Sequence, residues 1–242
     1  MTTPAPGAAA GPPKWKPLDA RQRRVLGVLI EKAKTTPAGY PMTVNAVMLG
    51  CNQKSNRDPE MSLDTDTVER LLEELRVLGA VAEAPESTRS VKFRHRAYEW
   101  LGVERAELAV MAELLLRGAQ TLGELRGRAA RMEPLADMAA LKPVVDGLVQ
   151  RGLMIELTGP GRGQVVSHNL HVEGELAELR ARYAGHAGGA AHGEPEARGA
   201  APPGVREEVA RLAGELSELR AEVARLGERV AAIETGTGGR TE

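Results

Sequence analysis

Three basic side chains alternate along one short segment, at Lys92, Arg94 and Arg96, and Arg89 precedes them in the adjoining turn. Alternate residues of an extended strand point to the same face. The three charges would therefore form one positive stripe, and such side chains hold phosphate oxygens without reading bases. Two other readings stay open, because the stripe could be the solvated side of a hairpin or could pair with an acidic helix.

Two further basic groups lie in a polar turn and along a short helix. Basic side chains gathered on a surface are the electrostatic footprint of nucleic-acid binding, but the whole chain carries a net charge of −1 and no segment has a strong basic excess. This balance weakens the case for nucleic acid, and such basic groups could hold phosphates without reading sequence. The candidate contacts are Lys54, Arg57, Arg89, Lys92, Arg94, Arg96, Arg126, Arg128 and Arg131.

Side chains suited to catalysis are sparse. The single cysteine, Cys51, closes an apolar segment and is expected in the core, and it excludes an internal disulfide. None of the five histidines has a spacing partner suited to zinc or to a nucleophile, and His168 and His171 are expected on opposite faces of one strand. The glycine-rich 159–163 lies between predicted strands and is a hairpin turn. We predict a protein that is not an enzyme and has no cofactor or metal.

The turn before the third predicted helix is rich in amides and hydroxyls. Such side chains could contact a ligand or nucleic acid, but they more often satisfy backbone groups in a tight connection. We favour the structural role. The residues are Asn45, Asn52, Gln53, Ser55 and Asn56.

Hydrophobic periodicity places these residues on a helix-turn-helix followed by a hairpin, which is the plan of a winged helix. The Asp19 and Gln22 pair resembles a capping box, and Thr43 and Asp64 are placed to cap later helices. The predicted helices span 19–34, 44–51 and 64–79, and the predicted strands span 80–84 and 91–98.

The same order recurs after about 80 residues, so the sequence predicts two winged helices in tandem. Thr121 and Glu124 form a second capping-box pattern, and Pro143 falls inside the sixth predicted helix, which must start late or kink. The corresponding helices are expected over 102–121, 121–132 and 138–151, and the strands over 154–158 and 164–172.

The third helix of each half is a poor reader of DNA bases. The first carries five acidic side chains against Arg70 and Arg76, and the second carries Lys142 and Arg151 against Asp146. Reading bases in the major groove needs Arg, Lys, Asn or Gln on the outer face. We therefore expect neither helix to read sequence.

A regular heptad pattern spans residues 205–233. Placing Val209, Leu216, Val223 and Val230 at a leaves leucine at most d positions, which favours a parallel dimer through residues 205–233. We predict a mainly α protein with small β-hairpin wings, an α+β class. Its segments are a lead-in (1–17), two winged-helix domains (18–100 and 101–172), a short helix and linker (173–203), a coiled coil (204–234) and a tail (235–242).

The sequence also bounds the setting in which the protein works. No apolar run approaches the length of a membrane span, and residues 1–17 have no apolar signal core. A cytoplasmic protein that does not bind membranes is the expectation.

Two long stretches resemble the YceH family of bacterial proteins. These are TTPAGYPMTVNAVMLGCNQKSNRDP, which begins at Thr35, and LLLRGAQTLGELRGRAARM, which begins at Leu114. The resemblance covers about residues 18–172 and implies tandem winged helices, but no established activity comes with it. Two departures are Glu104, where the family often has a serine cap, and Pro143.

Two functions fit these patterns. The first is sequence-tolerant DNA association, connected with transcription-related regulation, by a homodimer. The second is a protein-docking adaptor that offers an acidic third-helix face to a basic partner. We favour the first because the basic stripe, the Lys54–Arg57 turn and dimerisation all serve it, and salt dependence distinguishes the two.

Overall fold

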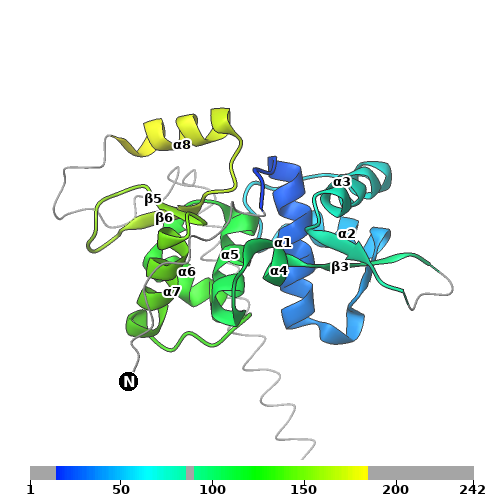
Figure 1. Cartoon of the computed structure of the whole chain (residues 1–242), viewed down its shortest axis with the longest axis horizontal. Coiled ribbons are helices and arrows are strands. Elements are labelled where there is room, and N and C mark those ends of the chain that lie inside the picture. Colours follow the sequence, from blue (N-terminus) through cyan, green and yellow to red (C-terminus); the bar gives the residue numbers. More distant parts are fainter. Residues whose placement is uncertain (1–14, 86–89, 185–242) are drawn as a thin grey trace, which may run out of the picture. The chain divides into compact units, whose positions relative to one another are not determined.

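The computed structural model describes residues 15–85 and 90–184, all of which belong to a compact unit spanning residues 1–189. Helices and two small antiparallel sheets alternate along the chain (Figure 1). This confirms the predicted α+β class with small strand hairpins. The predicted coiled coil lies outside the described residues.

The first half follows the predicted order. The Asp19–Gln22 capping box is present, Thr43 accepts from the N–H of Ala46, and Asp64 accepts from the N–H of Thr67. These caps satisfy backbone donors that a helix start leaves unpaired. The elements are α1 (Ala20–Thr35), η1 (Pro37–Gly39), β1 (Met42–Thr43), α2 (Val44–Cys51), α3 (Thr65–Val77), β2 (Val81–Glu83) and β3 (Lys92–His95).

A short helix, α4 (Ala97–Leu101), occupies residues that the sequence pattern assigned to a strand ending at Tyr98. The strand ends at His95, whose Nδ1 accepts from the N–H of Ala97 (3.3 Å). Helical spacing then buries Ala97, Trp100 and Leu101 together, and the Trp100 indole donates to the carbonyl of Leu78 (2.9 Å). Packing of this ring outweighs the local alternation.

The second half repeats the first. The first sheet has the order β1-β3-β2 and the second has the order β4-β6-β5, both antiparallel. Helix α7 begins at Met138 and contains Pro143 on its exposed side, so it does not start after the proline. The elements are α5 (Arg105–Arg117), β4 (Gln120–Thr121), α6 (Leu122–Ala129), α7 (Met138–Gln150), β5 (Met154–Glu156), β6 (Val165–His168) and α8 (Glu173–Ala184).

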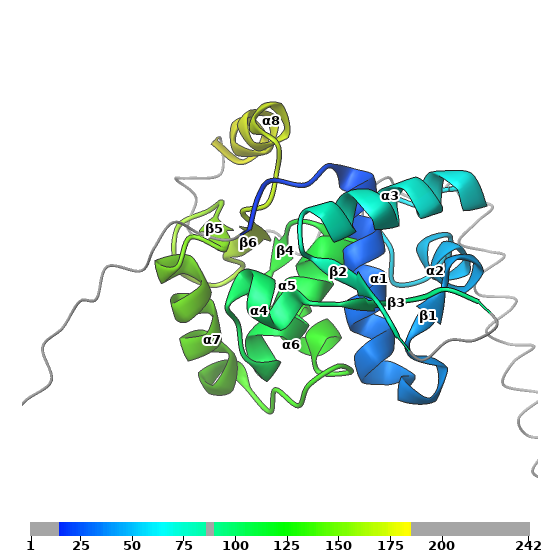
Figure 2. The same cartoon turned by 45° about the vertical axis from the view of Figure 1, so that its right-hand side comes forward.

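Helices α1 and α5 pack side by side and join the two halves (Figures 1 and 2). One hydrophobic cluster runs through both halves, and α1 is buried along the whole stretch 23–31. A helix that is covered on every side lies inside a core rather than on its surface. Close approach needs Gly27, because a Cβ there would lie 3.0 Å from the Leu116 side chain.

A pair of glycine substitutions tests the packing around α1. A Cβ at Gly50 in α2 would lie 2.6 Å from Cγ1 of Val28, so Gly50→Ala should destabilise by about 1–3 kcal/mol through overpacking. A Cβ at Gly127 in α6 meets nothing within 4 Å, so Gly127→Ala should stabilise by roughly 0.5–1 kcal/mol. Urea unfolding measures both, and equal effects would contradict the packing described here.

Candidate nucleic-acid interface

The outer face of the first wing carries basic side chains, and the one acidic residue of β1 and β2, Glu83, pairs with Phe93 and therefore belongs to the other face. On β3, Arg94 is exposed and Lys92 half-buried, whereas Phe93 between them turns inward and is 6% exposed. Cross-strand partners share a face, and those of Lys92 and Arg94 are Thr43 and Ala82. The wing therefore presents uncompensated positive charge to solvent.

Of the three basic residues expected on one face of a strand, only Lys92 and Arg94 belong to β3. Arg96 lies beyond β3, takes a non-extended conformation and occupies the N-cap position of α4, where its side chain is exposed. It therefore does not continue the strand alternation, although it follows Arg94 by two residues. Arg89 lies outside the described residues.

Pairing between this stripe and the acidic third helix, one of the readings left open, is not observed. Two acids of α3 pair locally, Glu74 with Arg70 at 3.2 Å and Glu73 with Arg76 at 2.7 Å. Within 15–85 and 90–184, the side chains of Lys92, Arg94 and Arg96 make no hydrogen bond or ion pair. Their charges are therefore available to an external anion.

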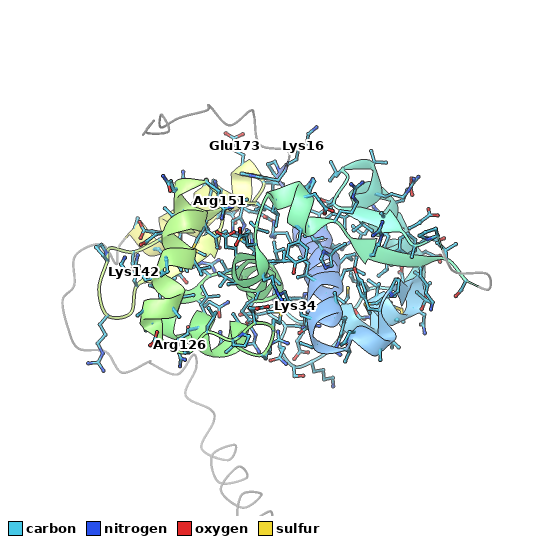
Figure 3. All side chains as sticks on the ribbon, turned by 60° about the horizontal axis from the view of Figure 1, so that its bottom comes forward. Lys16, Lys34, Arg126, Lys142, Arg151 and Glu173 are labelled. Carbon is cyan, nitrogen blue, oxygen red and sulfur yellow. The ribbon has the colours of Figure 1, made fainter. Side chains whose placement is uncertain are left out.

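Neither third helix offers a set of free basic side chains. In α7, Lys142 pairs with Asp146 at 3.3 Å. Arg151 donates to the carbonyl of Gly102 at 2.6 Å and contacts the carboxylate of Glu107. In Figure 3 the labelled Lys142 and Arg151 both lie on the second half. The basic side chains Lys142 and Arg151 therefore already have partners within the protein.

Arg57, predicted as a phosphate contact, is instead buried. Its guanidinium donates to both carboxylate oxygens of Glu31, at 2.6 and 3.2 Å, and to the carbonyl of Gly50 at 3.0 Å. The Arg57 side chain has no exposed surface and that of Glu31 is 3% exposed. A bidentate pair of this kind is a structural element, so Arg57 leaves the set of candidate contacts.

Arg131 extends this pair across the joint between the halves. Its guanidinium contacts Glu31 on α1 and Glu113 on α5, the latter at 3.0 Å, and Glu113 is fully buried. Arg117 reaches the same Glu113 carboxylate at 3.2 Å. We call Glu31, Arg57, Glu113, Arg117 and Arg131 the central charge network. Arg131 therefore has a structural role as well.

The charge state of Glu31 follows from these contacts. Burial by itself raises the pKa of a carboxyl group. Hydrogen bonds and charges from Arg57 and Arg131 outweigh burial, so the pKa of Glu31 lies below its ordinary value of 4.5. The stability that this group contributes is therefore present above about pH 4.5 and is lost as the pH falls through the lowered pKa.

The remaining predicted contacts are either paired within the protein or exposed. Arg126 donates to the carbonyls of Leu135 and Ala136 at 3.3 and 3.1 Å. Arg128 donates to Gln120 and Glu124, at 2.9 and 3.1 Å. Both are committed to the second half, whereas Lys54 is exposed. The surface candidates that the described residues retain are Lys54, Lys92, Arg94 and Arg96.

The polar turn has the structural role that its composition favoured. The Asn52 amide donates to the carbonyl of Leu63 and accepts from its N–H, both at 2.8 Å. Gln53 accepts from Arg57 at 2.9 Å, and Asn56, with a φ of 59°, accepts from Arg117 at 2.9 Å. These side chains hold the turn against the central charge network. Asn45 and Ser55 are exposed.

Sequence reasoning missed a cluster after β6. The rings of His168 and His171 stack with centroids 4.0 Å apart, so the expectation of opposite faces was wrong. Strand β6 ends at His168, and His171 turns back to place Nε2 3.1 Å from Oγ of Ser167 and Nδ1 3.5 Å from Glu175. The regular spacing of Ser167, His171 and Glu175 by four residues was the available signal.

This serine, histidine and carboxylate order is that of a hydrolase triad. Ser167, however, is fully buried, and the Glu175 carboxylate also accepts from Arg23 at 2.6 Å. A reacting carbonyl needs access to the serine oxygen, which this packing denies. The cluster instead ties α8 to β6 and α1. Among the described residues no set of side chains is grouped to hold a metal ion, and no helix is long and apolar enough to cross a membrane.

A substitution in the central charge network separates structure from binding. Arg57→Ala leaves the buried Glu31 without its bidentate partner and should destabilise by about 3 kcal/mol. Arg70→Ala, which breaks an exposed pair, should cost about 1 kcal/mol or less. Chemical denaturation measures both. A cost for Arg57→Ala no larger than that for Arg70→Ala would contradict the structural role.

Comparison with known proteins gives the family. Residues 18–162 match the family model described as "Protein of unknown function, DUF480". A UPF0502 protein of Rhodopirellula baltica is 51% identical over 164 residues, which cover 68% of this chain and 69% of the relative. Relatives from Stenotrophomonas maltophilia and Geobacter sulfurreducens are 40% identical over 212 residues and 42% identical over 204 residues. These two alignments cover 86% and 84% of this chain, and 94% and 87% of the relatives. The chain belongs to the DUF480 family of UPF0502 proteins, in agreement with its YceH-like signatures.

Proposed function

We propose that this protein associates with DNA through its first wing, without reading sequence and without catalysing a reaction. The observation that carries the proposal is the outer face of β3, where half-buried Lys92 and exposed Arg94 have the uncharged cross-strand partners Thr43 and Ala82. Exposed Arg96 and Lys54 extend the positive surface. A role in transcription-related regulation would follow from such binding.

The character of the charges explains why affinity without sequence preference is expected. Phosphate contacts position a protein on DNA, whereas base-edge contacts specify sequence. The third helices that would supply base contacts have their basic side chains in local pairs, Arg70 with Glu74, Arg76 with Glu73 and Lys142 with Asp146. Binding therefore depends on counterion release and should fall steeply with salt.

Neutralising the wing tests this proposal. In Lys92→Ala/Arg94→Ala/Arg96→Ala, affinity for a fluorescent generic duplex at low salt should fall, because up to three phosphate contacts are lost. The slope of log affinity against log salt should flatten by up to about 3. Fluorescence anisotropy across a salt series measures both quantities.

A control variant that loses the same number of positive charges elsewhere distinguishes binding at the wing from a general effect of net charge. Arg70→Ala/Lys142→Ala/Arg180→Ala also removes three exposed positive charges, from α3, α7 and α8. This variant should bind like the parent protein. Equal loss in the two variants would argue against the wing, and absence of parent binding at low salt would end the DNA proposal.

Dimerisation through residues 205–233 is part of the proposal, although these residues lie outside the described ones. Two copies would double the phosphate contacts on one duplex and raise affinity through effective concentration. A chain ending at Gly204 should sediment as a monomer and the full chain as a dimer. A truncated chain that remains dimeric would show that the heptads are not the interface.

A second candidate function is protein docking on the acidic face of α3. Asp66 and Glu69 are exposed, and within 15–85 and 90–184 neither makes an ion pair. A basic partner could pair with these carboxylates. Failure of the duplex measurement would make this face the next one to test.

A further inference from the structure

Three rings form a row beside the basic face of the first wing. The centroid of His95 lies 5.9 Å from that of Tyr40 and 5.8 Å from that of Tyr98, with the rings tilted by 51° and 47°. The chain has only three tyrosines, so two of them lie in this row. Aromatic side chains next to cations are the usual components of surfaces that bind single strands.

The row lies at an open edge of β3. Strand β1 pairs with β3 only through Met42 and Thr43. The next free donor, the backbone N–H of His95, is satisfied by the Tyr40 hydroxyl at 2.6 Å. The Tyr40 hydroxyl thereby accepts the hydrogen bond that a backbone carbonyl of a longer β1 would accept. This contact fixes Tyr40 against His95, and the charge of Arg94 is near enough to oppose the effect of burial on the pKa of Tyr40.

The His95 and Tyr40 rings are uncharged at neutral pH. Burial lowers the pKa of His95 to about 4 and raises the pKa of Tyr40 to about 12. His95 Nδ1 accepts from the N–H of Ala97, so the neutral ring carries its proton on Nε2. Across the described ranges, no partner is found for that Nε2–H. The row therefore offers ring surface and one hydrogen-bond donor.

Exposure distinguishes this row from ordinary core aromatics. Phe93 and Trp100, from the same elements, are 6% and 5% exposed, whereas Tyr98 is 38% exposed. Tyr40 and His95 are half-buried. Two charged groups act on His95: Glu99, which is exposed, and Lys34, which is already paired with Glu133 at 3.0 Å. Arg94 and Arg96 remain as the cations for a ligand.

We propose that the Tyr40–His95–Tyr98 row is a stacking site for an unpaired base of a single-stranded nucleic acid. The flanking phosphates would lie on Arg94 and Arg96. This inference rests on the proposed function and narrows the ligand to strands with unpaired bases, because a base inside a duplex cannot stack on a side-chain ring. Every base has a stacking face, so the site tolerates any sequence. DNA and RNA strands share this chemistry.

The experiment uses the full chain and a 12-nucleotide DNA strand with a central 2-aminopurine, whose fluorescence falls when the base stacks. The parent protein should quench this fluorescence and bind the strand more tightly than the matched duplex. Tyr98→Ala should weaken strand binding by at least about fivefold and abolish quenching, while duplex affinity stays within twofold. Tyr98→Phe keeps the ring and should behave like the parent.

Two controls make the outcomes distinct. Tyr183→Ala removes the tyrosine of α8 and should leave quenching unchanged, and the same strand made of RNA shows which sugar the site prefers. Equal strand affinity and quenching in the parent and Tyr98→Ala would overturn the stacking site while leaving duplex binding intact. Absence of binding to both strand and duplex would overturn the proposed function together with the site.

Discussion

The contact between α1 and α5 is the constraint on which the rest of this structure depends. It buries two carboxylates, Glu31 and Glu113, and buried ions are costly unless they are paired with good geometry. Arg57 and Arg131 supply that pairing from two turns that are distant in the sequence. The network therefore fixes the turn after α2 and the segment after α6 to the joint, and the two halves share one core.

This use of arginines decides where the protein can meet an anion. Arginines near the joint are committed to buried carboxylates or carbonyls, and those on α3 pair with acids one turn away. Local pairs of this kind contribute little stability, but they lower the field that α3 presents. On the first wing, the positive charge of β3 and of Arg96 just beyond it stays uncompensated. A net charge near zero is thus compatible with one basic face.

Periodicity and capping patterns were enough to predict the tandem order of helices and hairpins and to place α1, α2 and α3. These features are local, since a capping side chain and the backbone N–H that it satisfies lie within four residues of each other. The burial of Arg57 depends on a distant residue and could not be predicted from its neighbours. Its turn is polar and basic, and the arginine is buried because it pairs with Glu31, far back along the chain. Helix α4 was missed for the same reason. The polar–apolar alternation of β3 continues past His95, but Trp100 donates to the carbonyl of Leu78, a contact between residues far apart in the sequence that favours a helix there. The stacked His168 and His171 depend on a turn after β6 that no alternation predicts.

The shortness of β1 connects the two properties of the first wing. A longer β1 would pair with the N–H of His95 and cover this edge of the strand. Because β1 stops after Met42 and Thr43, a tyrosine hydroxyl satisfies that donor and brings a ring to the edge. Strand β3 then presents cations on one face and an aromatic row where its other face reaches the surface. A ligand that matches both must carry negative charge and flat apolar rings in regular succession, and a nucleic-acid strand with unpaired bases has that chemistry.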